Sequence, residues 1–468
     1  MIKLSDILIK NGFIITMDQN RRIIRDGAIY VNEGEIVSVG KTEEVTSSSA
    51  EFVIDAKNKV ILPGFVNVHT HLPSIFVRGV YGVMAQGLTS VLFPLKTYFT
   101  PEDMYLFGLA SCGEALYAGS TTIVETYNYL DHFARAVEEI GLRAVLGEQI
   151  VEADLMKIKD GVYEYNPEQA EKGLKRAREL IEKWQGGVNG KITTIVAPLA
   201  PDMTGPDTYR ECDALSKEYG LDISTHLSQS WGEVKQVKRM YGKTPPMHLA
   251  ELGIMDHRLS GAHCTYVTDE ERMLMSRSGA KILHCPRPYA AGGRTNPLVQ
   301  CLDMGIPVGL GTDNVYHSMN ETLRVGLFAS RIRSQFVGGS NRMLAVERPS
   351  HLEMLELATI KGAEVMGLDD KVGSLEPGKR ADIIAYDMMS PHLTPTMEPL
   401  SSILLYGTSP DIDTVIVDGE IRKENHRIKG SDMNKILTDA QRRVNELWTT
   451  FFEDNPESRR LWERYLPY

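Results

Sequence analysis

Two histidines separated by one residue are the first feature of this sequence that could support chemistry. His69 and His71 end a short apolar run that starts at Ile61 and contains the pair Pro63-Gly64. Side chains of a β-strand alternate between its two faces, so both imidazoles point the same way from the carboxyl end of the predicted strand. Neutral imidazoles held side by side in this way are typical of half of a divalent-metal site.

Further metal-compatible side chains occur where later strands are predicted to end. His226 and His263 each end an apolar segment, and Asp313 directly follows a third segment. Three imidazoles with one carboxylate match a catalytic zinc or iron(II) site that keeps one position open for water. A metal ion in such a site lowers the pKa of its water to about 7 and supplies hydroxide at neutral pH. Asp313 could both hold the metal and accept the proton of that water, while His263 could polarise the substrate or hold the attacking water.

These residues can meet only if the strands that carry them converge. Strand-like and helical segments alternate through the middle of the chain, and two of the clearest helical patterns cover Gln169–Trp184 and Thr208–Tyr219. The predicted strands are the run ending at His71, Thr121–Glu125, Arg143–Gly147, Ile192–Pro198, Asp222–His226, Leu259–His263, Lys281–Cys285 and Pro307–Thr312. Eight strand–helix repeats predict an α/β fold of the (β/α)₈ barrel type, whose site lies at the carboxyl ends of the strands.

Both ends of the chain have a different sequence pattern, in which short β-like segments are separated by turn signals. We therefore predict one small β-sandwich domain assembled from residues 1–60 and 369–430, and a hydrolase barrel over residues 61–368. Two separate β caps are the less economical alternative. Residues 431–468 are expected to form a helical tail that packs on the barrel or on a partner subunit.

Composition excludes several classes of partner. The chain has 468 residues, 42% hydrophobic and 24% charged, which is typical of a globular protein with a large core. Its net charge of −11 argues against nucleic acid or an anionic membrane as a partner. The first residues lack the apolar core of a signal peptide, and no apolar run is long enough to span a membrane. The five dispersed cysteines favour a reducing compartment, so the expected location is the cytoplasm.

Several motifs together resemble the amidohydrolase superfamily, in particular its branch of aminohydrolases and chlorohydrolases that act on nitrogen heterocycles. The matching stretches are Pro63–His71, Gly119–Thr122, Ala262–Cys264, Gly311–Asp313 and Val372–Asp382. That branch includes adenosine-type and S-adenosylhomocysteine deaminases, guanine deaminase and s-triazine hydrolases. The resemblance implies one metal held by His69, His71, His226 and Asp313, with His263 in the second catalytic position. It also implies a dimer or larger homo-oligomer.

The sequence departs from the deaminase pattern at three places. Deaminases have a glutamate three residues after the fifth-strand histidine, where this chain has Gln229. Glutamine exchanges hydrogen bonds but carries no titrating proton, so it could only orient ring atoms of the substrate. A histidine is missing after Pro198, and the segment from Pro286 to Arg294 replaces the usual Ser-Asn pair and Lys. These changes weaken adenosine, S-adenosylhomocysteine and guanine as substrates.

Three interpretations of Gln229 remain open. The enzyme removes a leaving group that needs little acid help, such as chloride or an activated amine. Alternatively it opens a cyclic amide, imide or amidine, with one or two metals and with Asp313 handling the proton. In the third interpretation the chain is a silent scaffold, although scaffolds usually lose several of the histidines that are present here.

Other polar residues near the predicted strand ends are candidates for the substrate pocket. The expected rim residues are Arg78, Glu125, Arg287, Arg294, Asn296 and His317. Glu148 could bridge a second metal, although a pocket-lining role is the preferred interpretation. His284, which lies inside its strand, is expected to be a packing residue. The expected cofactor is one divalent ion, Zn²⁺ first, with Fe²⁺ or Mn²⁺ as alternatives.

Overall fold

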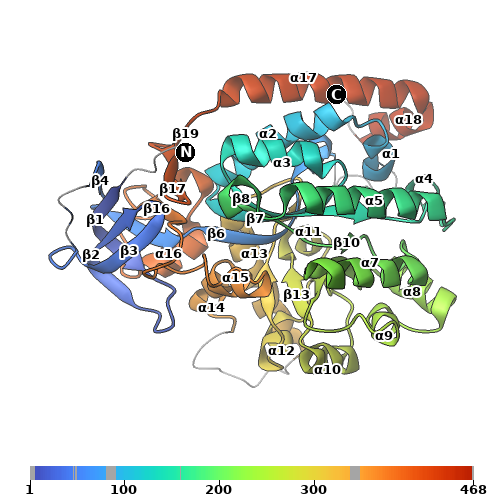
Figure 1. Ribbon diagram of the computed structural model, residues 1–468, viewed down its shortest axis with the longest axis horizontal. Helices are drawn as coiled ribbons and strands as arrows, with labels where there is room; N and C mark the ends of the chain where they lie inside the picture. Colours follow the sequence, from blue (N-terminus) through green and yellow to red (C-terminus); the bar gives the residue numbers. More distant parts are fainter. Residues whose placement is uncertain are drawn as a thin grey trace.

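The computed structural model describes residues 6–45, 47, 50–80, 91–158, 160–337 and 348–465. Strands from both chain ends lie beside a larger α/β body, and a long C-terminal helix crosses that body (Figure 1).

Strands from both ends of the chain form one sheet in the order β19-β18-β17-β16-β5-β1-β2-β3, and β4 also pairs with β1. These strands are β1 (Ile7–Ile15), β2 (Ile23–Asn32), β3 (Glu35–Lys41), β4 (Phe52–Asp55), β5 (Lys59–Pro63), β16 (Ile383–Asp387), β17 (Ile412–Val417), β18 (Glu420–Glu424) and β19 (Arg427–Ile428). The N-terminal and C-terminal halves join where β5 pairs antiparallel with β16. A separate apolar cluster that includes Ile9, Ile29, Ile61 and Ile383 fills this part of the molecule.

The strands of the α/β body form two parallel sheets that meet at two seams. One sheet has the order β10-β8-β7-β6-β15, with β9 on β8, and the other has the order β11-β12-β13-β14. A bridge between Val196 and Ile223 joins the sheets at one seam, and at the other β15, two residues beyond β14, pairs with β6. The bounds are β6 (Phe65–His71), β7 (Ser120–Tyr127), β8 (Arg143–Ile150), β9 (Ile192–Thr194), β10 (Ala197–Pro198), β11 (Ile223–Leu227), β12 (Leu259–His263), β13 (Lys281–His284), β14 (Val308–Leu310) and β15 (Asp313–Asn314).

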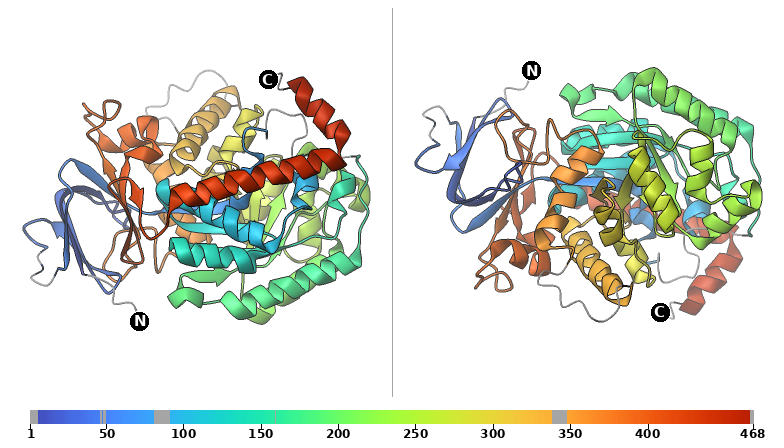
Figure 2. Two further views of the ribbon diagram at one scale, coloured as in Figure 1. Left: turned by 90° about the horizontal axis from the view of Figure 1, so that it is seen from above. Right: turned by 90° about the horizontal axis from the view of Figure 1, so that it is seen from below.

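Helices surround these strands on the outside (Figure 2). In the first half they are α1 (Phe93–Lys96), α2 (Pro101–Tyr117), α3 (Leu130–Ile140), α4 (Leu155–Ile158), α5 (Pro167–Trp184), α6 (Gly187–Gly190), α7 (Pro206–Tyr219), α8 (Trp231–Tyr241) and α9 (Pro245–Glu251), with the 3₁₀ helix η1 (Leu72–Val77). In the second half they are α10 (Asp269–Ser278), α11 (Pro286–Ala291), α12 (Leu298–Asp303), α13 (Met319–Val337), α14 (His351–Leu357), α15 (Ile360–Val365), α16 (Pro399–Tyr406), η3 (Ser409–Asp411), α17 (Met433–Asp454) and α18 (Pro456–Tyr465). The helical patterns predicted at Gln169–Trp184 and Thr208–Tyr219 lie within α5 and α7.

The predicted strand from Ile61 to His71 is in fact two strands, and Gly64 separates them. β5 belongs to the sheet of the chain ends, whereas β6 belongs to the α/β body. The Gly64 amide donates to the Asp382 carbonyl oxygen at 2.9 Å, and a Cβ at Gly64 would lie 2.2 Å from the Thr121 side chain. The chain therefore changes sheets at a point where only glycine fits. The segment Ile192–Pro198 likewise divides, into β9 and β10.

A buried ion network connects the two parts of the molecule. Arg143 on β8 donates to Asp382 at 3.2 Å and to Asp418 at 3.0 Å, and all three side chains are less than a tenth exposed. Branched apolar side chains fill the interior of the α/β body, among them Val66, Val68, Val124, Val145 and Leu283. The division into domains at residues 60 and 368 stays a prediction.

The C-terminal segment forms the helices α17 and α18 and packs on the α/β body. α17 lies across it in both views of Figure 2. Arg443 pairs with Asp103 of α2 at 2.6 Å, and the indole of Trp448 donates to the Phe76 carbonyl oxygen at 2.9 Å. Leu447 and Phe451 are buried beneath the helix. These contacts hold α17 beside η1 and α2, which follow and flank the strand that carries the paired histidines.

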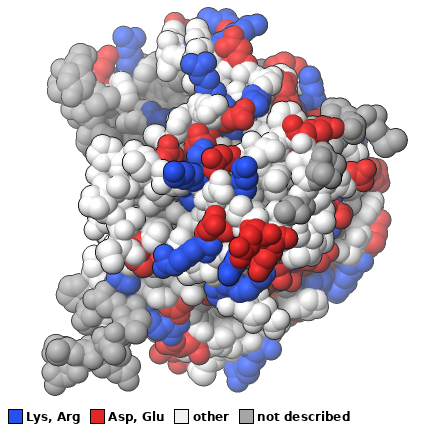
Figure 3. All heavy atoms as spheres, turned by 90° about the vertical axis from the view of Figure 1, so that its left-hand side faces the viewer, with Lys and Arg blue, Asp and Glu red and all other residues white. Residues whose placement is uncertain are grey.

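The face of the molecule drawn in Figure 3 carries charges of both signs. On the face drawn in Figure 3, lysine and arginine side chains are interspersed with aspartate and glutamate side chains. No helix in the described part of the chain has the length and apolar character needed to cross a membrane.

Candidate metal centre

Four histidines and one aspartate from four different strands converge at the carboxyl ends of the α/β body. Their ligand atoms form two overlapping groups, each within 4.8 Å: His69, His226 and His263 in one, and His69, His71 and Asp313 in the other. All five are the residues that the sequence pattern placed at strand ends. The convergence of residues more than 200 positions apart follows from the closing of β15 onto β6.

Backbone carbonyls fix the orientation of two of these imidazoles. The Nδ1 of His71 lies 2.8 Å from the Thr126 carbonyl oxygen, and the Nδ1 of His226 lies 2.7 Å from the Leu199 carbonyl oxygen. Each ring therefore donates its proton to the backbone, and its Nε2 keeps a lone pair. The two Nε2 atoms face each other at 3.0 Å. Two lone pairs at this distance repel unless a cation lies beside them, which is the arrangement of metal-ligating histidines.

His69 gives an independent indication of a metal. It is 1% exposed, and among the described residues neither of its ring nitrogens has a hydrogen-bond partner. Its Nε2 lies 3.8 Å from Asp313 Oδ1, and the His71 Nε2 lies 3.7 Å from the same oxygen. Buried polar atoms without partners are costly and rare, and a metal ion would satisfy them. The donors present therefore fit a divalent cation.

Burial sets the protonation of these groups. It lowers the pKa of His226 to about 4 and lowers the pKa of His69, His71 and His263 well below the ordinary value. The imidazoles are thus neutral near pH 7, as metal ligands must be. Burial raises the pKa of the Asp313 carboxyl to about 7, with Arg287 acting in the opposite direction. A carboxyl group in this range can exchange a proton near neutral pH.

Unusual backbone geometry accompanies the site. His263 (φ 75°) and Asp313 (φ 64°) are both in the left-handed region, which non-glycine residues seldom adopt. Strained residues of this kind cluster at functional sites. Next to Asp313, Gly311 lets β14 approach β6 closely, because a Cβ there would lie 2.8 Å from the His69 carbonyl oxygen.

Gln229 lies beside the metal ligands. Its backbone amide donates to the buried Glu233 carboxylate at 2.8 Å, and its side-chain oxygen lies 3.5 Å from the Tyr289 hydroxyl. Gln229 lines a small cavity together with His71 and His226. The glutamine is therefore placed to contact a molecule that approaches the histidines.

The rim residues predicted from sequence have protein partners. Arg78 pairs with Glu114 and donates to the Val315 carbonyl oxygen at 2.8 Å, while Arg287 pairs with Glu321 at 2.7 Å. Arg294 lies over the Tyr289 ring, 5.4 Å from its centroid. None of the three arginines is among the residues that line the cavity at His71 and His226. Their contact with substrate stays a prediction.

The other three rim candidates are buried. Asn296 donates to the carbonyl oxygens of His263 and Cys264, both at 2.8 Å. His317 is fully buried, and its Nδ1 lies 3.4 Å from the Thr312 hydroxyl. Glu125 is also fully buried and accepts hydrogen bonds from the Thr70 hydroxyl and the Leu72 amide, at 2.8 and 2.7 Å. Their contacts support the strand-end loops, and a contact with substrate stays a prediction for them too.

Glu148 has protein partners at both of its oxygens. It accepts from the amides of Tyr129 and Leu130, at 3.2 and 3.0 Å, and from Arg176 at 2.8 Å. It belongs to neither group of converging ligand atoms. His284 is buried in β13, in accord with the packing role expected from sequence.

Sequence reasoning missed several polar residues near the site, among them one lysine, one tyrosine and one glutamine. Lys96, Tyr127 and Gln149 line the same cavity as His71, His226 and Gln229. Tyr127 could have been found, because it follows Glu125 by two residues and so lies on the same face of β7. Gln149 lies two residues beyond the third predicted strand, which was placed at Arg143–Gly147, and is inside the observed β8. Lys96 is on a four-residue helix in a loop, and no spacing rule points to it.

Comparison with known proteins adds to this picture. Residues 60–422 match the model of the amidohydrolase family. The chain is 32% identical over 452 residues to a 5-methylthioadenosine/S-adenosylhomocysteine deaminase of Carboxydothermus hydrogenoformans, covering 95% of this chain and 98% of the relative. A crystal structure of an adenosine deaminase from Xanthomonas campestris with bound zinc superposes with a TM-score of 0.86, at 22% identity and 95% and 99% coverage. That of the zinc-complexed atrazine chlorohydrolase of Arthrobacter aurescens TC1 gives 0.83, at 23% identity, covering 94% of this chain and 100% of the other.

The chain belongs to the amidohydrolase family, and it is a hydrolase with the α/β barrel and β domain of that family. The predictions of family, fold class and enzyme class are therefore confirmed. A candidate metal-binding group is present, as the family resemblance implied.

Proposed function

We propose that this protein is a zinc-dependent aminohydrolase that replaces a substituent on an electrophilic ring carbon of a small nitrogen heterocycle with oxygen. One observation carries the proposal. The Nε2 atoms of His71 and His226 face each other at 3.0 Å, with both Nδ1 protons held by backbone carbonyls, beside the unpartnered imidazole of His69. The zinc named in two structures of the same fold supports the choice of metal.

Each residue of the site has a separate role in this proposal. His69, His71, His226 and Asp313 would hold the metal, which when bound supplies a Lewis acid that lowers the pKa of a water molecule. Asp313 accepts the proton of the attacking water at a carboxylate oxygen, and its raised pKa suits this role. His263 stabilises the negative charge that develops on the ring. Gln229 orients ring atoms by hydrogen bonds.

The side chain of Gln229 indicates which type of leaving group the enzyme removes. An amide side chain cannot protonate a departing amine, so the favoured substituents are an activated amine or a halide. The deaminase and the chlorohydrolase to which the chain is similar are named for these two outcomes. The second candidate is the opening of a cyclic amide or imide, with Asp313 moving the proton.

Several features complete the proposal. One metal is favoured over two because both oxygens of Glu148 already have protein partners. The catalytically silent scaffold is disfavoured because the full ligand set is present. We also propose that the protein acts in the cytoplasm as a dimer or larger homo-oligomer, without nucleic acid or membrane partners.

The test follows ammonia, chloride and new carboxylate over a panel of heterocycles, for wild type beside Gln229→Glu, with His226→Ala as the inactive control. The panel contains 5′-methylthioadenosine, S-adenosylhomocysteine, aminotriazines, chlorotriazines and cyclic imides. We expect ammonia or chloride release by the wild type, and a gain of at least about tenfold for poorly activated amines in Gln229→Glu. Formation of a carboxylate alone would favour ring opening. Turnover that survives His226→Ala would contradict the assigned site.

A further inference from the structure

Lys96, at the end of α1, lies next to the metal centre and has no role in the mechanism above. Its ammonium donates to the Gln149 side-chain oxygen at 2.9 Å and lies 3.8 Å from the centroid of the Tyr127 ring. The Gln149 amide nitrogen in turn donates at 3.0 Å to the Thr126 carbonyl oxygen, the same atom that accepts from His71. A short hydrogen-bonded chain thus fixes the lysine relative to a metal ligand.

The positive charge of Lys96 has no carboxylate partner. Within the described residues no carboxylate oxygen forms an ion pair with its Nζ, whereas the two nearest acids have other partners. Glu148 is paired with Arg176, and Glu125 accepts from Thr70 and Leu72. An ammonium has three N–H donors, and only one of them is used in a conventional hydrogen bond here.

The surroundings of Lys96 make this charge costly. Leu92, Phe93, Leu199 and Met203 line the same cavity. Burial lowers the pKa of Lys96 to about 7, although Glu148 acts in the opposite direction. A cation on apolar walls without a counter-ion gains from any anion that reaches it.

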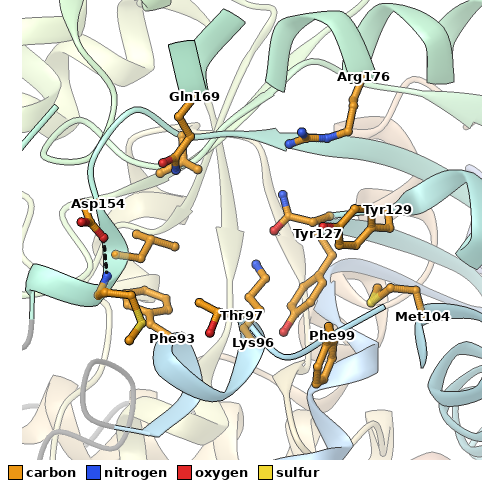
Figure 4. A pocket seen from close by; sticks show the side chains of 14 residues that line it. Phe93, Lys96, Thr97, Phe99, Met104, Tyr127, Tyr129, Asp154, Gln169 and Arg176 are labelled. Carbon is orange, nitrogen blue, oxygen red and sulfur yellow. Dashed lines mark hydrogen bonds between the residues drawn. The ribbon is translucent and has the colours of Figure 1, made fainter. Parts of the chain in front are cut away.

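Lys96 also connects two cavities. Phe93, Lys96 and Tyr127 line both the cavity at the metal ligands and a neighbouring one of about 260 Å³. In Figure 4 the Lys96 side chain points into the second cavity between Tyr127 and Thr97, and Gln169 and Arg176 lie across from it. A molecule whose ring reaches the metal centre can therefore place a substituent at the ammonium and extend beyond it.

We propose that Lys96 is a specificity-determining residue that selects heterocycles carrying a carboxylate substituent. The carboxylate would accept hydrogen bonds from the ammonium and neutralise it, while the ring faces His71, His226 and Gln229. A single cation matches the single charge of a carboxylate, and Arg176 is already paired with Glu148. The inference rests on the proposed function for the position of the ring, but the charge preference is measured separately from turnover.

The experiment compares two probes of equal size, a chlorotriazine with a carboxymethylamino substituent and its carboxamide, with the corresponding chloropyrimidine pair as a second ring. Binding to the metal-loaded protein is measured by calorimetry, and kcat and KM by chloride release. The variants are Lys96→Met, which keeps the stem and removes the charge, and Lys96→Arg, which keeps the charge. Lys175→Met, at an exposed position on α5, is the matched control.

We expect the wild type and the control to favour the carboxylate over the amide by at least about tenfold in Kd and KM, with similar kcat. Lys96→Met should bring this ratio to about one, and Lys96→Arg should keep a preference of the same sign. Equal affinity for the two probes, no measurable binding of the carboxylate, or a preference that persists in Lys96→Met would overturn the proposal. A carboxylate preference without hydrolysis would support the role of Lys96 and count against the proposed function. Equal hydrolysis of both probes would support the proposed function and count against the role of Lys96.

Discussion

At the scale of single residues, the metal centre depends on backbone atoms as much as on side chains. The carbonyl oxygens of Thr126 and Leu199 fix which nitrogen of His71 and of His226 carries the proton. Metal-ligating histidines commonly have such partners, which orient the ring and raise its basicity. A carbonyl oxygen has no signature in a sequence, so this part of the site emerges only from the fold.

Protonation of Asp313 gives the first prediction. Burial raises the pKa of this carboxyl to about 7, whereas the four imidazoles are neutral at pH 6 because burial lowers their pKa values. At a pH below this pKa, a metal that binds must displace the proton of Asp313. At a pH above it, the carboxylate is already deprotonated. Zinc binding to metal-free protein should therefore release about 0.9 protons from Asp313 at pH 6, whereas at pH 8.5 the released proton should come from the metal-bound water, whose pKa the metal lowers to about 7.

Calorimetry in buffers of different ionisation enthalpy measures this release. Asp313→Asn should bind zinc more weakly and lose the proton release at pH 6. A release at pH 6 that persists in Asp313→Asn would mean that another group supplies the proton.

The convergence of the candidate ligand residues could be predicted from sequence because each is a distinctive residue at the end of an apolar run. His69, His71, His226, His263 and Asp313 all satisfy this condition, and the structure brings them together. Lys96 could not be predicted, because its position depends on the course of the loop after η1 and on packing against Tyr127. Likewise, the arginines expected at the pocket rim were chosen by charge alone, and Arg78 and Arg287 have carboxylate partners that only tertiary packing defines.

At the scale of elements, the alternation of strands and helices was enough to predict the α/β fold. This alternation did not predict where an apolar run divides into two strands. The run from Ile61 to His71 reads as one strand, yet its first half pairs with β1 and β16. Apolar residues suit both environments, so only the close approach of Thr121 to Gly64 fixes the break.

Gly311 gives a prediction at this scale. A Cβ at Gly311 would lie 2.8 Å from the carbonyl oxygen of His69 and 2.9 Å from the backbone nitrogen of His69. The strands β14 and β6 would therefore have to separate. Gly311→Ala should destabilise the protein by about 1–3 kcal/mol, as overpacking does, and should weaken zinc binding because His69 and Asp313 move apart. Denaturant unfolding and a zinc titration measure the two effects.

Gly232→Ala serves as the control, because Gly232 is in the helix α8 and a Cβ there has only the Ser230 hydroxyl nearby, at 3.4 Å. This change should be neutral or stabilising by up to about 1 kcal/mol. If Gly311→Ala behaved like the control, the close strand contact would have no bearing on the site.

At the scale of the whole molecule, the two chain ends and the α/β body form a connected structure around one site. Arg143 joins β8 to Asp382, which precedes β16, and to Asp418, which follows β17. Arg443 anchors α17 on α2. The similarity to deaminases and chlorohydrolases extends over nearly the whole chain. We therefore propose that the departure at Gln229 changes the chemistry locally within a shared architecture.

The most direct test of the central claim is metal analysis of the purified protein after exposure to zinc, for the wild type beside His226→Ala. We predict about one zinc per wild-type chain, and much less in the variant, because three imidazoles and one carboxylate form a single site. Two metals per chain would indicate a bridged centre involving Glu148. Absence of bound metal from the wild type, even after reconstitution, would contradict the account.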